Sequence, residues 1–306
     1  MNSTISHRTP TSAGDDASTK QIAADVAQRL RIADRLIMPL DESLELLEQL
    51  QEFALGRFLL HNRGLNGYWT AYIFRHVPGE KASSPLEQWL LDDSLLCRAR
   101  ERFHRFKAEI AHSLRDGAVL ASVPCGLMDD LLLQDYSGVR DVKLVGVDID
   151  EESLGHAKDN AQARGLADRC EFLAQDAWEM NVDGEFDLLV SNGLNMYEPD
   201  PDRLTELYRR FRQALRPGGR LLLSFLTPPP PPPWVAPDQA AAWEKYDIPE
   251  ADLRRELSLF GDILQAKYLN FCGEADTRRQ LESAGLAVEA VHYNENGVLP
   301  IAVAVK

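Results

Sequence analysis

The chain has 306 residues, 44% of them hydrophobic, which is enough for one large α/β domain and a smaller appendage. It carries 48 acidic and 33 basic residues, a net charge of −15 that repels phosphate backbones and argues against a nucleic-acid partner. The four cysteines lack C-x-x-C spacing, the N-terminus lacks a signal-peptide pattern, and no apolar run approaches the roughly 18 residues of a membrane span. We therefore expect a cytoplasmic protein with no metal site and no membrane partner.

The first third of the chain has the pattern of a helical cap. Residues 1–20 are rich in Ser, Thr, Gly and Asp and are expected to be disordered. Apolar residues recur at spacings of three and four over 22–33 and 44–54, which indicates two amphipathic helices, and Asp41 is a candidate N-cap for the second. An aromatic segment at 67–76 and a helix over 85–114 complete a predicted cap at 21–115.

From residue 118 onward, strands alternate with helices, which predicts a parallel sheet. The expected strands are 118–123, 143–148, 170–174, 186–191 and 220–225, and the expected helices are 129–135, 153–165 and 201–215. The segment 215–220, LRPGGR, is expected to be a turn.

The last third departs from this alternation. Six consecutive prolines open an insertion at 228–264 with an acidic helical segment near 243–264. A helix at 277–284 should end at Gly285, and the segments 287–293 and 299–305 around a turn at 294–297 predict an antiparallel hairpin.

The most informative stretch is the first strand-turn-helix-strand unit. An apolar strand breaks at Pro-Cys-Gly, and the next strand ends at Asp148, 22 residues after Gly126. A nucleotide-binding α/β unit places its ribose-binding carboxylate at about this distance, roughly 20 residues beyond the glycine turn. The turn lacks the G-x-G-x-x-G pattern that grips a pyrophosphate. This argues against a nicotinamide dehydrogenase and favours S-adenosylmethionine.

Several segments together resemble the class I S-adenosylmethionine-dependent methyltransferases over about 118–306. They are PCG at 124–126, the acidic end of GVDID at 146–150, QDAW at 175–178, FDLLVSNG at 186–193, LRPGGRLLLSF at 215–225, and the terminal hairpin. The resemblance implies an α/β, Rossmann-like, seven-stranded mixed sheet with an antiparallel C-terminal hairpin at 116–306. It also implies that S-adenosylmethionine lies across the carboxyl ends of the first strands.

The resemblance assigns roles to individual residues. Asp148 would accept hydrogen bonds from the ribose hydroxyls, with Ile149 beside it, and helix capping, the other possible role, suits Asp150 better. Asp176 would bind the adenine amino group, with Ala177 and Trp178 at the base, unless Asp176 is a plain turn carboxylate and Trp178 a core residue. The remaining cofactor-binding candidates are Ser122, Pro124, Cys125, Gly126 and Ser191.

The chain departs from the family pattern at the turn after the first strand. Ser122 stands where the family has an acid that helps to hold the cofactor's ammonium group, and Pro124 and Met128 replace glycines. Either Asp129 or Asp130 could supply the missing carboxylate, and either could simply complement the helix N-terminus. The residues expected to bind the nucleoside thus match the family pattern, whereas those expected to bind the amino-acid part of the cofactor depart from it.

The candidate catalytic residues are neutral. Asn192, Asn195 and Tyr197 follow the fourth strand, where the family presents groups to the reacting atoms, or they serve as turn residues. Tyr68 and Tyr72 share one face of a cap helix and could enclose the sulfonium by cation–π contact. Such a site suits a small amphipathic substrate better than a weak acid that must be deprotonated.

Three functions remain open at this point. The first is methyl transfer to a small metabolite of specialised metabolism. The second is cyclisation of S-adenosylmethionine to azetidine-2-carboxylate with release of methylthioadenosine, because the altered turn and the cap are similar to the azetidine-2-carboxylate synthases. The third is a non-enzymatic scaffold, against which the presence of both Asp148 and Asp176 argues.

Overall fold

The computed structural model describes residues 16–246, 248–266, 270–294, 297 and 299–306. The chain divides into two compact units, and the boundary falls within helix α6 (Leu95–Ala111). The first unit contains the chain up to Arg100 together with Pro232–Lys267. The second contains Glu101–Pro231 and Tyr268–Lys306.

The first unit is helical and includes the segment after the proline run. Its elements are α1 (Asp16–Arg31), α2 (Leu40–Leu50), α3 (Ala54–Asn62), α4 (Gly67–Arg75), α5 (Pro85–Asp92), the start of α6, the 3₁₀ helix η3 (Pro237–Tyr246), α10 (Glu250–Leu257) and the π-helical turn η4 (Ser258–Ile263). Leu259 and Ile263 of η4 pack in the same core as Leu50 and Phe58. The insertion therefore shares a hydrophobic core with the N-terminal helices.

Four details of this helical unit differ from the sequence-based predictions. Residues 16–20, expected to be disordered, form the first turns of α1, while 1–15 lie outside the described residues. Asp41 lies inside the first turn of α2, whose N-cap is the extended Pro39. The helix predicted at 85–114 is divided between α5 and α6, and at the break the Ser94 hydroxyl donates to the Leu90 carbonyl (2.6 Å) and accepts from the Leu96 amide (3.1 Å). The acidic segment at 243–264 is divided among η3, α10 and η4.

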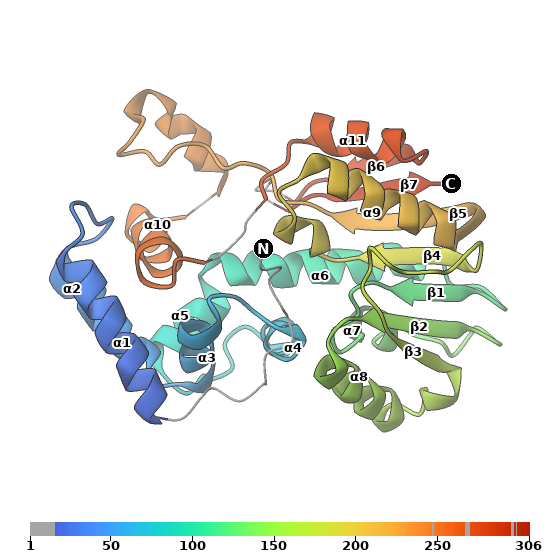
Figure 1. The fold of residues 1–306 in the computed structure, drawn as a ribbon, viewed down its shortest axis with the longest axis horizontal. Coiled ribbons are helices and arrows are strands. Elements are labelled where there is room, and N and C mark those ends of the chain that lie inside the picture. Colours follow the sequence, from blue (N-terminus) through green and yellow to red (C-terminus); the bar gives the residue numbers. More distant parts are fainter. Residues whose placement is uncertain (1–15, 247, 267–269, 295–296, 298) are drawn as a thin grey trace. The chain divides into compact units, whose positions relative to one another are not determined.

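The second unit is built on a seven-stranded sheet with the strand order β3-β2-β1-β4-β5-β7-β6 (Figure 1). The strands are β1 (Val119–Ser122), β2 (Lys143–Asp148), β3 (Cys170–Ala174), β4 (Phe186–Ser191), β5 (Leu215–Ser224), β6 (Ala287–His292) and β7 (Ile301–Val305). The first five strands run parallel, and β7 pairs antiparallel with both β5 and β6. The α/β, Rossmann-like mixed sheet with an antiparallel C-terminal hairpin is therefore confirmed. The predicted turn at 294–297 includes 295 and 296, which lie outside the described residues.

Helices cover both faces of this sheet. The helices are α7 (Asp129–Leu132), α8 (Glu151–Ala163), α9 (Pro201–Ala214) and α11 (Glu274–Ser283). Ala121 packs in a core with α9 and α11, whereas its neighbour Leu120 packs in a second core with α7, α8 and Phe106 of α6. Successive strand residues point to opposite faces, so each apolar strand supplies both cores. The left-handed Gly285 (φ +83°) follows α11, as predicted.

The LRPGGR segment is not the simple turn that its Pro-Gly-Gly content indicates. It belongs to β5 and contains a register shift against β4, between the pairs Phe186–Leu215 and Leu188–Arg220. Gly218 adopts φ +75°, and a Cβ on Gly219 would lie 2.8 Å from the Phe186 carbonyl oxygen. The glycines therefore form a bulge that keeps the strand paired, a role that sequence alone does not distinguish from a turn.

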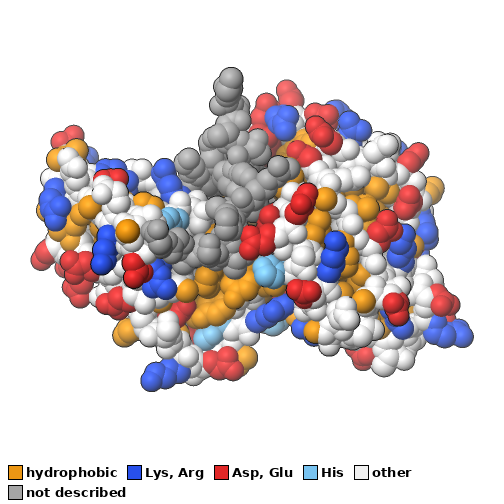
Figure 2. All heavy atoms as spheres, turned by 60° about the horizontal axis from the view of Figure 1, so that its bottom comes forward, with side chains coloured by type: hydrophobic (Ala, Val, Ile, Leu, Met, Phe, Trp, Pro, Cys, Tyr) orange, Lys and Arg blue, Asp and Glu red, His pale blue; other side chains and the backbone are white. Residues whose placement is uncertain are grey.

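The surface shows mixed charge. Figure 2 shows acidic and basic side chains interspersed over one face of the described residues. Among the helices of the described ranges, none is long and apolar enough to cross a membrane.

Candidate active site

The turn after β1 is held by backbone hydrogen bonds from both neighbouring strands. The Val123 amide donates to the Val190 carbonyl and the Cys125 amide to the Val147 carbonyl, both at 2.9 Å. Gly146 in the middle of β2 makes room for this turn, because a Cβ there would lie 2.9 Å from Met128 Sδ and 3.0 Å from Cys125 Sγ. The sequence motifs did not single out this glycine, whose one signal is its place within an apolar strand.

Asp148 lies at the carboxyl end of β2 against this turn. Its Oδ2 accepts a hydrogen bond from the Gly126 amide (2.8 Å), and its Oδ1 accepts one from the Asp150 amide (3.0 Å). A carboxylate offers about four lone-pair sites in all, and it can therefore accept several hydrogen bonds at once. Asp150 is the N-cap of α8, and its carboxylate accepts hydrogen bonds from the Ser153 amide (3.2 Å) and hydroxyl (2.6 Å). The expectation that Asp150 rather than Asp148 caps this helix is confirmed.

The segment after β3 brings Asp176 to the same edge of the sheet. The Gln175 amide donates to the Asp148 carbonyl (3.0 Å), and Asp176 Oδ1 accepts from the Trp178 amide (2.9 Å). Ala177 is buried, whereas Ile149 and Asp176 are half-buried. Asp176, Ala177 and Trp178 thus form a tight turn, and this is the segment that was predicted to bind adenine.

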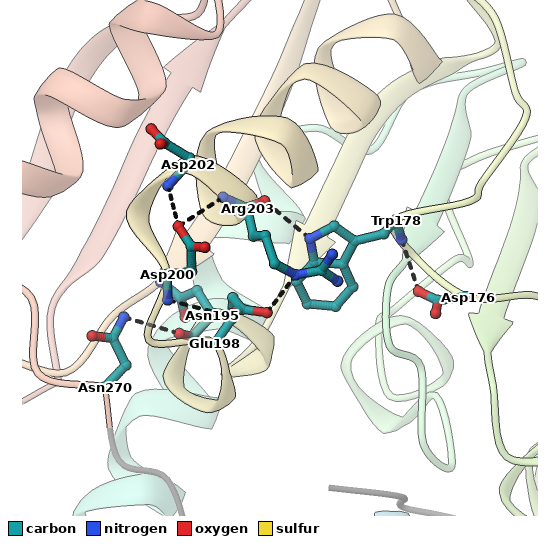
Figure 3. A network of polar contacts seen from close by, with 8 residues as sticks. All are labelled: Asp176, Trp178, Asn195, Glu198, Asp200, Asp202, Arg203 and Asn270. Carbon is teal, nitrogen blue, oxygen red and sulfur yellow. Dashed lines mark hydrogen bonds and ion pairs between the residues drawn. The ribbon is translucent and has the colours of Figure 1, made fainter. Parts of the chain in front are cut away.

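Trp178 is fixed by α9 (Figure 3). Its indole Nε1 donates to the Arg203 carbonyl (3.0 Å), and the Arg203 guanidinium lies 5.4 Å from the ring centroid. Glu198 pairs with Arg203 at 2.8 Å, which locks the cation in place. Trp178 therefore packs against the core and also contacts the Arg203–Glu198 ion pair.

Three buried polar atoms near the carboxyl ends of β3 and β4 have no hydrogen-bond partner among the residues that the structure describes. They are Gln175 Oε1, Ser191 Oγ and Asn195 Oδ1. Natural proteins rarely leave such atoms unsatisfied unless a ligand or water completes them. Together with the oriented carboxylate of Asp148, they fit a polar nucleoside cofactor over this edge.

The candidate catalytic groups after β4 are held by the core. Asn192 Oδ1 accepts from the Ser224 hydroxyl (3.2 Å), and Asn195 Nδ2 donates to the Tyr208 hydroxyl (3.2 Å). The Asn195 carbonyl also accepts from Asn270 Nδ2 (3.3 Å). Burial raises the pKa of Tyr197 above its ordinary value, which makes its phenol a hydrogen-bonding group rather than a base.

The two carboxylates of α7 that could replace the missing acid of the first motif have different partners. Ser122 donates its hydroxyl hydrogen bond to Asp130 Oδ2 (2.7 Å), while Asp129 is bound by the Asn160 amide nitrogen (2.8 Å). Asp130 is only 7% exposed, and desolvation raises its pKa to about 6. Of the two candidates, Asp130 is therefore the carboxylate that lies against the position of the missing acid.

Tyr68 and Tyr72 belong to the helical unit. The Tyr72 hydroxyl donates to the buried Glu87 Oε1 (3.1 Å), and both tyrosine rings contact the Trp69 ring edge-on, at centroid distances of 5.2 and 5.3 Å. Burial and then Glu87 raise the pKa of Tyr72 to about 12. These contacts stabilise the aromatic segment, and the catalytic role of the two tyrosines stays a prediction.

The comparisons with known proteins agree with this geometry. Residues 125–219 match the model of a methyltransferase domain. This match lies within the sheet-forming unit and covers about a third of the chain, and it supports the resemblance to the class I S-adenosylmethionine-dependent methyltransferases. The fold of the chain is also similar to that of magnesium protoporphyrin IX methyltransferase from Synechocystis PCC 6803, crystallised with S-adenosylhomocysteine. That likeness has a TM-score of 0.51 and 15% identity, over 78% of this chain and 94% of the other.

Two other relatives are more similar in sequence. The chain is similar to a possible exported protein from Bordetella parapertussis, whose crystal structure is known. The sequence identity is 39% and the TM-score is 0.87, over 100% of this chain and 99% of that one. The mitomycin biosynthesis 6-O-methyltransferase of Streptomyces lavendulae is 34% identical over 92 residues, 30% of this chain. The match spans only 25% of the length of that enzyme.

Proposed function

We propose that the protein is an S-adenosylmethionine-dependent enzyme that transfers a methyl group to a small metabolite. The observation that carries this proposal is the position of Asp148 at the carboxyl end of β2, oriented by the Gly126 amide of the adjoining turn. Ligands of open α/β sheets bind at the carboxyl ends of the strands, where the strand order reverses, which here is between β1 and β4.

We assign the parts of the cofactor to residues near the carboxyl ends of three strands. Asp148 would hold the ribose hydroxyls, and Asp176 with the Ala177 amide would hold the adenine edge. Ile149 and Trp178 would lie beside the base, and Asp130, which accepts a hydrogen bond from Ser122, would bind the ammonium group. S-adenosylmethionine supplies an electrophilic methyl group on its sulfonium.

The groups after β4 support transfer to an acceptor that needs no strong base. Asn192 and Asn195 are held by Ser224 and Tyr208, and the pKa of Tyr197 is raised by burial. Fixed neutral groups can orient an acceptor and exclude water, which gives a rate advantage by proximity. The partial match to a mitomycin biosynthesis methyltransferase supports an acceptor from specialised metabolism.

One observation favours a second function, cyclisation of S-adenosylmethionine to azetidine-2-carboxylate. The pKa of Asp130 is raised to about 6, which makes this carboxylate a better proton acceptor than an ordinary aspartate. In this reaction the ammonium group loses a proton and its nitrogen attacks the γ-carbon. The bond from that carbon to sulfur breaks, and methylthioadenosine leaves.

Product analysis separates these functions. Purified protein is incubated with S-adenosylmethionine, alone and with a small-molecule extract of cells, and an Asp148→Ala variant serves as the inactive control. Methyl transfer yields S-adenosylhomocysteine only when the extract is present, whereas cyclisation yields methylthioadenosine from S-adenosylmethionine alone. Neither product, with intact binding of S-adenosylhomocysteine, would favour a non-enzymatic scaffold and contradict the proposal.

A further inference from the structure

Arg102 is a charged residue on the buried, otherwise apolar face of α6. Residues 102, 106 and 110 follow one another at intervals of four and therefore share one helical face. Phe106 and Ile110 are fully buried in the core beneath the sheet, and Arg102 is only 8% exposed. A cation at this position of an apolar stripe is a signal that the sequence motifs did not single out.

The guanidinium of Arg102 makes no ion pair with any residue that the structure describes. Its Nη1 lies 3.7 Å from Met196 Sδ, a weak acceptor, and its Nε is buried without a hydrogen-bond partner. Its Nη2 lies 3.8 Å from the place that a Cβ on Gly193 would occupy. The group has five N–H donors, and the described part of the chain supplies one poor partner for them.

The charge nevertheless persists at neutral pH. Burial lowers the pKa of Arg102 to about 10, which still leaves the group protonated. The nearby Tyr197 phenol is neutral because burial raises its pKa, so it supplies no anion. A buried charge is unfavourable unless it is paired, so a bound anion would complete this arrangement.

The surroundings place this cation at the reacting end of the candidate site. Gly193 and Met196 belong to the segment directly after β4, between the candidate catalytic residues Asn192 and Tyr197. The adjacent strand β1 ends at Ser122, which pairs with Val190 of β4. The planar fork of a guanidinium matches the two oxygens of a carboxylate.

We propose that Arg102 binds a carboxylate at the β4 end of the site. This inference rests on the proposed function, in which that end of the site holds the reacting groups. The carboxylate has two possible sources, the amino-acid part of S-adenosylmethionine or an acidic small-molecule acceptor. Both require the same bidentate pairing with the same side chain.

The first arm of the test concerns the cofactor. Calorimetry compares S-adenosylhomocysteine with its decarboxylated analogue on the wild-type protein, on Arg102→Met and on Arg102→Lys. If the cofactor supplies the carboxylate, the wild type should prefer S-adenosylhomocysteine by about 10- to 100-fold, since hydrogen bonds between charged groups are stronger than neutral ones. Arg102→Met should lose this preference, and Arg102→Lys should retain part of it.

The second arm concerns an acceptor. Benzoate and hexanoate are compared with benzamide and hexanamide on the protein with and without S-adenosylhomocysteine. If the acceptor supplies the carboxylate, the acids should bind better than the amides, and Arg102→Met should abolish the difference. Arg105→Met is the matched control, because Arg105 is half-buried on the same helix and has a protein partner, the Tyr293 carbonyl.

The outcomes are distinct. A carboxylate preference in either arm that depends on Arg102 supports the inference and identifies the source. If neither preference exists in the wild type, or if it survives in Arg102→Met, the inference is wrong, even where S-adenosylhomocysteine binds normally. Failure of the wild type to bind S-adenosylhomocysteine at all would instead contradict the proposed function, and the second arm without cofactor would still test Arg102.

Discussion

Replacing Asp148 by alanine is expected to weaken S-adenosylhomocysteine binding by about 100-fold or more. Two ribose hydroxyls would each lose a charged acceptor, and a hydrogen bond to a charged group contributes about 1.5–3 kcal/mol. The substitution also removes the acceptor of the Gly126 amide, so the turn after β1 loses one of its hydrogen bonds to β2. Isothermal calorimetry on the wild type and the variant measures this loss.

Two further variants control this experiment. Asp148→Asn keeps the shape of the side chain but removes its charge, and it should bind more weakly than wild type but more tightly than Asp148→Ala. Asp150→Ser removes the neighbouring buried carboxylate while leaving a good N-cap on α8, and its affinity should stay close to wild type. If Asp148→Ala bound S-adenosylhomocysteine as tightly as the wild type does, the assignment of Asp148 to the ribose would be wrong.

Replacing Asp130 by asparagine should change the pH dependence of stability. The pKa of Asp130 is about 6 in the folded chain against 3.8 for an ordinary aspartate. Between these values the unfolded chain releases the proton first, so the wild type loses stability as the pH rises from about 4 through 6. The asparagine variant should lack this loss, which amounts to about 2–3 kcal/mol.

The measurement is urea unfolding of both proteins from pH 4.5 to pH 7.5 without cofactor. The stability of Asp130→Asn relative to wild type should increase over this range. Asp135→Asn is the matched control on an exposed carboxylate, whose pKa is lowered by hydrogen bonds from Ser137. Its relative stability should stay nearly constant, because this group is ionised in both the folded and the unfolded chain throughout the range. A constant difference between wild type and Asp130→Asn would mean that Asp130 is not buried as described.

Sequence patterns predicted the central sheet well for a physical reason. The strands 143–148 and 186–191 agree with the structure because each is a short apolar run that ends in polar turn residues, a pattern typical of strands with both faces covered. The edge strand 170–174 also agrees, although none of its residues is fully buried. The bulge at 215–220 could not be predicted, because the same Pro-Gly-Gly residues suit a turn, and only pairing with β4 and β7 keeps them in the sheet.

The position of Asp148 beside the glycine turn was predictable from the sequence, whereas the contacts of the two carboxylates of α7 were not. Asp148 follows from its distance to the glycine turn, a relation that local chain geometry sets. The choice between Asp129 and Asp130 depends on which carboxylate reaches Ser122 across the turn, and that is decided by tertiary packing. Arg102 was not predicted because its importance lies in the absence of a described ion-pair partner, which no sequence pattern records.

A crystal structure of the wild-type protein with S-adenosylhomocysteine tests the central claim most directly. We expect the ribose hydroxyls within hydrogen-bonding distance of the Asp148 carboxylate and the adenine beside Asp176 and the Ala177 amide. We also expect Ser191 Oγ or Asn195 Oδ1, both without a partner among the described residues, to gain one on the ligand or on an ordered water. A nucleoside bound away from the carboxyl ends of β2 and β3 would contradict the assignment of this edge of the sheet as the active site.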